Sequence, residues 1–301
     1  MSLDGITTIV LSYRSQSNVI GAVRSLLDQN EPTEIIVVNS GGGPIKRLLR
    51  AEGIQVPCLD HQDRLFVGGA RNRGLAETTT RYVAFLAADC RARPNWVQRR
   101  LKAHRTGARA VASAIVNNAP QSHVASAAYL CMFMRRLPGL PADRAIRFGA
   151  SYERSLFAEF GLFDEDLRSG EDTDFLERLP PELRPVWDGG IQTEHLNETR
   201  FLPLLWDQFC RGVRYSEERQ HLFGARKFRV AKEIIRQAPL AAEFARQGLQ
   251  GDELATVTRA MPIVKTALIA RAAGALLSNV LPSDLGTRRS TDSGKTVHDN
   301  P

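Results

Sequence analysis

Short apolar runs alternate with amphipathic stretches along the first third of the chain. The first run reads Ile-Thr-Thr-Ile-Val-Leu-Ser over residues 6–12, and the second reads Glu-Ile-Ile-Val-Val over residues 34–38. Brief runs rich in β-branched residues are typical of buried strands, whereas apolar residues at three- and four-residue steps are typical of helices. The pattern predicts strands at residues 6–12, 34–38, 54–59 and 82–86. It predicts intervening helices at residues 19–27, 44–50 and 69–77.

This alternation predicts an α/β fold with a mostly parallel, Rossmann-type sheet that is flanked by helices. In sheets of this kind, ligands bind beyond the carboxyl ends of the strands. We therefore expect the chemistry in the loops that follow Ser12, Val38 and Leu86.

The remainder of the chain is less regular and then becomes helical. A strand is predicted at 111–116, a helix at 171–179, and either a helix or an extended segment at 121–135. The later helical stretches are 201–220, 226–247 and 253–280, with interruptions predicted at Pro239 and Pro262. The polar segment 283–301 is predicted to be disordered. This reading divides the chain into an α/β domain at 1–200, a helical C-terminal extension at 201–282 and a disordered tail at 283–301.

Composition excludes several classes of protein. With 43% hydrophobic and 24% charged residues, the 301-residue chain is typical of a globular protein. Lys265 and Arg271 interrupt the most apolar stretch, 261–281, so no bilayer span is predicted. A net charge of +7 and the lack of a recognition motif argue against a nucleic-acid partner. Because the opening residues carry no leader pattern and the cysteines have no metal-ligand spacing, a reducing, cytoplasmic setting is expected.

Three isolated side chains are candidates for chemistry, and each has a structural alternative. Asp89 follows the strand at 82–86, where a carboxylate can bridge a divalent cation to a nucleotide diphosphate or simply form a turn. Asp172 lies in the first turn of the predicted helix 171–179, which favours an ionised general base but also fits a solvated helix start. His195 is either a metal ligand or a hydrogen-bonded structural residue.

Two glycine-bearing loops are further candidates. The loop 39–43 matches neither the Walker phosphate loop nor the dinucleotide fingerprint, so ligand contact and a flexible turn both stay open. The segment 68–74 sets arginines at a helix start, where they either meet phosphate oxygens or form a charged helix face.

The order of the motifs carries more information than any one of them. The chain runs through Ile-Val-Leu-Ser-Tyr-Arg, Glu-Ile-Ile-Val-Val-Asn-Ser-Gly and Gly-Gly-Ala-Arg-Asn-Arg-Gly-Leu. It continues with Tyr-Val-Ala-Phe-Leu-Ala-Ala-Asp-Cys-Arg-Ala-Arg-Pro-Asn-Trp, Phe-Gly-Leu-Phe-Asp-Glu-Asp-Leu and Gly-Glu-Asp-Thr-Asp-Phe-Leu-Glu-Arg-Leu. Over about residues 5–215, this series resembles the glycosyltransferase family 2 domain, which has the GT-A fold of nucleotide-diphospho-sugar transferases.

The resemblance implies roles for particular residues. Asp89 matches the final Asp of the family's metal-binding Asp-x-Asp motif, and His195 lies where many members carry a histidine near the metal. Asp172 matches the catalytic base of inverting members. The implied nucleotide-binding residues are Ser12, Tyr13, Arg14, Asn39, Arg71, Asn72 and Ala88.

The chain departs from the family pattern at two positions. Asn39 stands where the family usually has an Asp that contacts the base, and Ala87 replaces the first Asp of the metal motif. These departures leave open a catalytically silent sugar-nucleotide-binding or scaffold subunit of a polysaccharide assembly complex. A sugar nucleotidyltransferase is discounted, because that class has a glycine-rich loop directly after its first strand and residues 12–16 contain no glycine.

The resemblance implies an inverting, metal-dependent glycosyltransferase that acts in bacterial polysaccharide or glycolipid assembly. The expected donor is a nucleotide-sugar, with a UDP-sugar favoured, the acceptor is a glycan or a lipid-linked sugar, and the cofactor is Mn²⁺ or Mg²⁺. Basic and apolar residues alternate over 226–236. That segment is interpreted either as part of a helical cap or as a peripheral contact with the inner face of the cell membrane.

Overall fold

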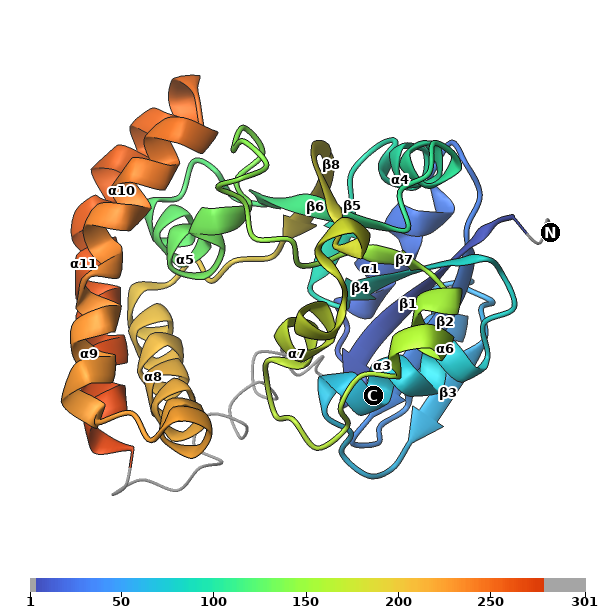
Figure 1. Ribbon diagram of the computed structural model, residues 1–301, viewed down its shortest axis with the longest axis horizontal. Coiled ribbons are helices and arrows are strands. Elements are labelled where there is room, and N and C mark those ends of the chain that lie inside the picture. Colours follow the sequence, from blue (N-terminus) through green and yellow to red (C-terminus); the bar gives the residue numbers. More distant parts are fainter. Residues whose placement is uncertain (1–3, 279–301) are drawn as a thin grey trace, which may run out of the picture. The chain divides into compact units, whose positions relative to one another are not determined.

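The computed structural model describes residues 4–278, which form two compact units. The sheet unit comprises residues 4–118 and 135–196, and the helical unit comprises residues 119–134 and 197–278 (Figure 1). Residues 119–134 therefore group with the C-terminal helices and not with the sheet. The tail predicted to be disordered, 283–301, lies outside the described residues.

The sheet unit is built on an eight-stranded sheet with the order β3-β2-β1-β4-β7-β6-β8-β5. Strands β5 and β7 run antiparallel to their neighbours, and the other pairings are parallel. The mostly parallel α/β fold is thus confirmed. The strands are β1 (Ile6–Tyr13), β2 (Glu34–Ser40), β3 (Cys58–His61), β4 (Tyr82–Ala87), β5 (Cys90–Ala92), β6 (Ala110–Asn117), β7 (Ser151–Glu153) and β8 (Val186–His195).

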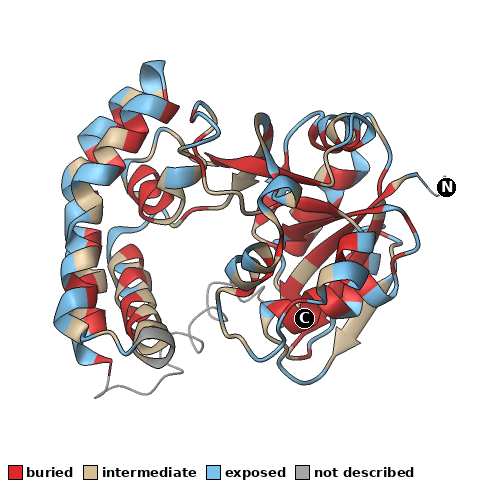
Figure 2. Cartoon of the chain, in the orientation of Figure 1, coloured by how far each residue is buried: buried red, intermediate tan, exposed pale blue. Residues whose placement is uncertain are grey.

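Helices cover the sheet and enclose one apolar core on each face. Neighbouring residues of β1 show the alternation, because Val10 packs into one core and Ile9 into the other. A strand that is buried on both faces has few polar positions, which explains the continuous apolar run in the sequence. Figure 2 shows this burial along the central strands. The helices of this unit are α1 (Val19–Leu27), α2 (Ile45–Ala51), α3 (Val67–Ala76), α4 (Trp96–Arg105), α6 (Ser155–Phe160) and α7 (Glu171–Arg178).

The strand predicted at 54–59 is shorter and later in the structure, where β3 spans Cys58–His61. The first predicted residues instead end α2: Gly53 has a φ of 71°, and the backbone N–H of Ile54 donates to Leu49 at 2.9 Å. The side chain of Ile54 then packs into the core. Apolar character at Ile54 therefore reflects a buried helix terminus and not a strand.

The helical unit contains α5 (His123–Phe133), α8 (Phe201–Phe223), α9 (Lys227–Ile235), α10 (Gln237–Gly248) and α11 (Gly251–Leu277). The segment at 121–135, left open between helix and extended chain, is thus a helix, and Ser122 caps it by accepting a hydrogen bond from the Ala125 N–H at 3.2 Å. Helix α11 packs against the other four helices. It crosses α8 closely, because a Cβ on Gly274 would overlap the carbonyl oxygen of Phe209.

The interruption predicted at Pro262 is wrong, because α11 continues through this residue. Proline in a helix interior costs about 3 kcal/mol or more. The buried residues Val257, Ala260 and Val264 flank it on the packed face, and their burial offsets that cost. Pro239 lies in the first turn of α10, where its missing N–H has no helical partner to lose, and the chain breaks just before it at Arg236.

By length and composition, α11 is also the one helix within residues 4–278 that could cross a membrane, although no such span is predicted from the sequence. Only 39% of its most apolar window is buried. Arg271 lies in this helix, is half-buried, and donates to the carbonyl of Cys131 on α5 at 3.2 Å. Helix α11 therefore packs within the helical unit through its contacts with four other helices, although less than half of its most apolar window is buried.

Candidate active site

A cavity of about 400 Å³ opens at the carboxyl ends of β1 and β4 in the sheet unit. This is the edge at which parallel α/β sheets bind ligands. Six of the residues singled out from the sequence line it, namely Ser12, Tyr13, Arg71, Ala88, Asp89 and Asp172. The other four, Arg14, Asn39, Asn72 and His195, lie beside or behind its wall.

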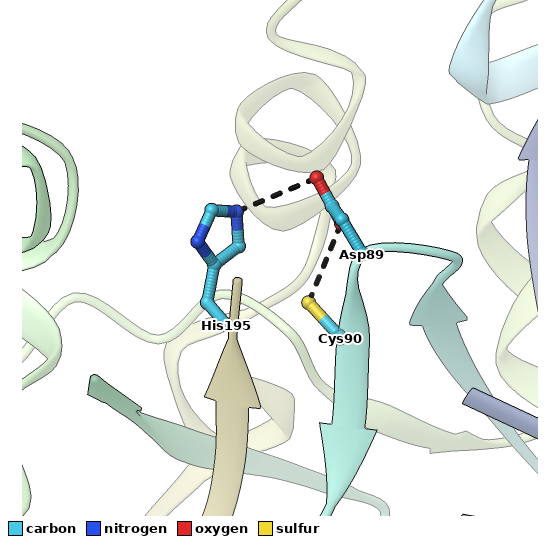
Figure 3. Close-up of side chains that lie close together, drawn as sticks. All are labelled: Asp89, Cys90 and His195. Carbon is cyan, nitrogen blue, oxygen red and sulfur yellow. Dashed lines mark hydrogen bonds and ion pairs between the residues drawn. The ribbon is translucent and has the colours of Figure 1, made fainter. Parts of the chain in front are cut away.

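Asp89, Cys90 and His195 form one cluster at this edge (Figure 3). The Asp89 carboxylate follows β4, and its Oδ2 lies 3.5 Å from Nε2 of His195 at the end of β8. The thiol of Cys90 donates to Oδ1 of Asp89 at 3.6 Å. Removal from water raises the pKa of Asp89, but the hydrogen bond and charge of His195 outweigh it, so this pKa is lowered overall. An ionised carboxylate beside an imidazole is able to hold a divalent cation.

Asp172 occupies the first turn of α7 and lines the same cavity as Asp89. Gly170 precedes the helix with a φ of 90°, a conformation that favours glycine. The guanidinium of Arg71 contacts both oxygens of Asp172, with Nη2 donating to Oδ2 at 3.2 Å and Nη1 contacting Oδ1. The same Nη1 lies 3.2 Å from Oε1 of Glu171. The carboxylate of Asp172 therefore has a fixed orientation.

Arg71 is buried, and its environment is both apolar and acidic. Its guanidinium lies 5.1 Å from the ring centre of Phe85 and 4.9 Å from that of Phe163. Burial opposes the charged form, but Asp172 and Glu171 outweigh burial, so the pKa of Arg71 is raised above its usual range. In this structure Arg71 thus acts as the counter-ion of two acids at the cavity wall.

Asn39 and Asn72 hold loops behind the cavity. The fully buried side chain of Asn39 accepts from the Ser15 N–H at 2.9 Å and donates to Asp60 Oδ1 at 2.8 Å and to the Gly42 carbonyl at 3.0 Å. These bonds tie the end of β1 to the glycine-bearing loop after β2. Asn72 similarly joins α3 to the segment before α7, donating to the carbonyl of Phe163 at 2.8 Å.

Tyr13 lines the cavity with an aromatic ring that lies near two arginines. The guanidinium carbon of Arg14 lies 5.2 Å from the Tyr13 ring centre, and that of Arg64 lies 5.7 Å away. Arg14 adopts a φ of 52°, which is uncommon for a residue other than glycine. A flat, cation-flanked ring is suited to stacking with a planar heterocycle.

Three cavity-lining arginines were not identified from the sequence: Arg64, Arg136 and Arg168. Arg136 donates to the carbonyl of Ser113 at 3.1 Å, and its guanidinium fills the space that a Cβ on Gly149 would need. Arg64 and Arg168 lie in irregular segments and Arg136 ends a short 3-10 helix, and none of the three belongs to a motif that would mark it in the sequence. Together with Arg71 they give the cavity a cationic lining that favours phosphate-bearing ligands.

A sequence model of the family described as Glycosyl transferase family 2 matches residues 7–157, about half of the chain. Among solved structures, the mannosyltransferase PcManGT from Pyrobaculum calidifontis, in complex with GDP-Man and Mn²⁺, is similar with a TM-score of 0.55. It is 16% identical, and the match covers 91% of this chain and 86% of that one.

TarS 1–349 from S. aureus, in complex with UDP-GlcNAc, is similar with a TM-score of 0.50 and 14% identity, over 86% of this chain and 70% of that one. No curated protein sequence matches the chain. The structural likenesses agree with the GT-A fold that the strand order and the helical layers describe. Together with the match over residues 7–157, they show that the chain belongs to glycosyltransferase family 2.

Proposed function

We propose that this glycosyltransferase transfers a sugar from a nucleoside diphosphate to a hydroxyl acceptor with inversion at the anomeric carbon. The observation that carries the proposal is that Asp89 and Asp172 line one cavity from different elements. One carboxylate is joined to His195 and the other to Arg71. This arrangement supplies a cation-binding group and a base to the same bound ligand.

In the proposed reaction, Asp172 accepts the proton of the acceptor hydroxyl while the hydroxyl oxygen attacks the anomeric carbon. The bond from that carbon to the diphosphate oxygen breaks, and the diphosphate leaves with the electron pair. A single displacement inverts the anomeric centre and needs no covalent enzyme intermediate. Arg71 keeps both oxygens of Asp172 oriented, so the base does not have to reorganise as the proton moves.

Asp89 and His195 are the residues that would hold Mn²⁺ or Mg²⁺, because a carboxylate oxygen and an imidazole nitrogen 3.5 Å apart suit a divalent cation. When bound, that cation supplies positive charge to the departing diphosphate. The arginines Arg136 and Arg168 add fixed positive charge along the same cavity. We assign the diphosphate of the donor to the part of the cavity that Arg136 and Arg168 line, and its nucleobase to the part that Tyr13 lines.

The proposal is tested by incubating the protein with manganese and a panel of UDP- and GDP-sugars and measuring nucleoside diphosphate release. PcManGT is solved with GDP-Man and TarS with UDP-GlcNAc, so both bases belong in the panel. We expect nucleoside diphosphate release from donors with one of the two nucleobases, with UDP-sugars favoured. A glycan or lipid-linked acceptor should increase the rate of that release. Donor binding by calorimetry without any release across the panel would instead support the scaffold subunit that Asn39 and Ala87 leave open.

We further propose that a bacterial lipid-linked acceptor is presented at the cytoplasmic membrane face and that α9 touches this surface. In α9 the side chains of Val230 and Ile234 are buried, so they belong to the packed face. Phe228 points outward instead, with 82% of its surface exposed, and Arg229 beside it is 79% exposed. An exposed aromatic ring next to basic residues is typical of contact with an anionic lipid surface.

The full chain is therefore expected to sediment with vesicles that contain phosphatidylglycerol more than with neutral vesicles. Combined Phe228→Ala and Arg229→Ala substitutions should reduce that sedimentation. The matched control is Leu27→Ala with Arg47→Ala, which removes an exposed apolar side chain and an exposed arginine from the sheet unit. Equal sedimentation of both variants and the unmodified protein would contradict a role for α9.

A further inference from the structure

The position of Cys90 in the sheet brings its thiol to the cation-binding edge. Strands β5 and β8 are antiparallel, and Cys90 is directly opposite His195 in their register. Opposite residues of an antiparallel pair project to the same face with their Cβ atoms about 4.5–5.5 Å apart. Asp89, the next residue along the chain, follows β4 and precedes β5. The paired strands therefore hold Cys90 and His195, and the turn between β4 and β5 holds Asp89 next to them.

The separations among the three groups are close to those of a metal site. Zinc binds sulfur at about 2.3 Å and imidazole nitrogen or carboxylate oxygen at about 2.0–2.2 Å, so tetrahedral ligand atoms lie roughly 3.3–3.8 Å apart. Oδ2 of Asp89 lies 3.5 Å from His195 Nε2, and its other oxygen, Oδ1, lies 3.6 Å from Cys90 Sγ. One ligand atom from each residue lies within 4.8 Å of the other two. Small side-chain adjustments would suffice to enclose an ion.

The donor set differs from the one that manganese or magnesium prefers. Carboxylate, carbonyl and water oxygens suit those hard cations, whereas a thiolate selects zinc and other thiophilic ions. Cys90 is 6% exposed, yet Asp89 and Cys90 both line the cavity, so an ion can reach them. Because Asp89 and Cys90 line the cavity, an ion held by the three residues would keep a further coordination position for a solvent or ligand oxygen.

We propose that Asp89, Cys90 and His195 form a three-ligand site for a thiophilic divalent cation of the zinc class, in which the Cys90 thiolate sets the preference over manganese and magnesium. Binding displaces the thiol proton into solvent, and the sulfur lone pair forms the new bond to the ion. The site shares Asp89 and His195 with the proposed transferase, but it does not depend on sugar transfer. A zinc-class ion and manganese would therefore compete for the same binding site.

Cobalt provides a direct probe, because thiolate coordination gives Co²⁺ a near-ultraviolet charge-transfer band. The full chain, kept reduced and free of oxygen, is titrated with Co²⁺. We expect one equivalent to produce the band, Zn²⁺ to abolish it at stoichiometric amounts, and excess Mn²⁺ to leave it in place. Mutation of outer-shell partners of metal ligands already lowers affinity about 10–100-fold. We therefore expect Cys90→Ser to remove the band and to weaken zinc binding by at least about a hundredfold.

Cys58→Ser is the matched control, since Cys58 is another thiol of the sheet unit and lies outside the cluster. It should keep the band. A band that persists in Cys90→Ser, or no band in the unmodified protein, would overturn the proposal. Cadmium NMR of the unmodified protein gives a second readout that needs no variant, and a cadmium shift without a sulfur ligand would also overturn it. None of these readouts uses turnover, so they separate this site from the transfer reaction.

Discussion

Asp172→Asn should lower the turnover of sugar transfer by roughly a hundredfold or more while leaving donor binding nearly unchanged. Removal of one group that acts on the transition state typically costs about 2.7–4 kcal/mol of barrier. Asparagine keeps the size of the side chain and can still accept a hydrogen bond from Arg71, but it cannot take a proton from the acceptor. Steady-state turnover and calorimetric donor affinity, measured on the same preparation, test both halves of this expectation.

Glu171 offers a matched control for this substitution. It is the neighbouring acid, it also lies within ion-pair distance of Arg71, and it does not line the cavity. Glu171→Gln removes the same charge from the same arginine, so it should retain most of the turnover if Asp172 is the base. Similar losses in both variants would assign the effect to the positioning of Arg71. Full turnover of Asp172→Asn would contradict the assignment of Asp172 as the general base.

The central strands of this fold could be predicted because their burial produces short apolar runs in the sequence. Residues of β1 such as Ile9 and Val10 pack into separate cores on opposite faces of the sheet. A strand buried on both faces has a continuous apolar run, whereas a helix buried on one face has apolar residues at every third or fourth position. Pro262 shows the limit of local rules. Its helix persists because partners distant in sequence bury that segment, and the sequence pattern alone does not reveal those partners.

Proximity within the site depends on sheet register and not on spacing along the chain. Cys90 and His195 face each other because β5 pairs with β8, and no motif marks that pairing. The resemblance to the family supplied Asp89 and His195 together, but it gave Cys90 no role. Arg136 lay beyond prediction for a similar reason, since the close approach that it makes to Gly149 exists only in the folded chain.

The pairing of Arg71 with two acids predicts a large loss of stability when the arginine is removed. Arg71→Met keeps a long apolar stem between Phe85 and Phe163 but leaves Glu171 and Asp172 as neighbouring carboxylates without their cation. Removing one partner of a buried ion pair typically costs about 3–5 kcal/mol. We therefore expect a loss of about that size in the free energy of unfolding, measured by urea denaturation with an unchanged m-value.

Arg73→Met is the matched control, because it removes another arginine from α3 and shows how much stability such a substitution costs without a buried ion pair. The Arg73 side chain is 48% exposed and lies 3.5 Å from Glu165, and exposed pairs of this kind contribute about 0–1 kcal/mol. The excess cost of Arg71→Met should shrink when Glu171→Gln is added, because that substitution removes one of the two neighbouring negative charges. Equal costs for the two arginine substitutions, or an excess cost that Glu171→Gln leaves unchanged, would mean that Arg71 contributes packing and not charge.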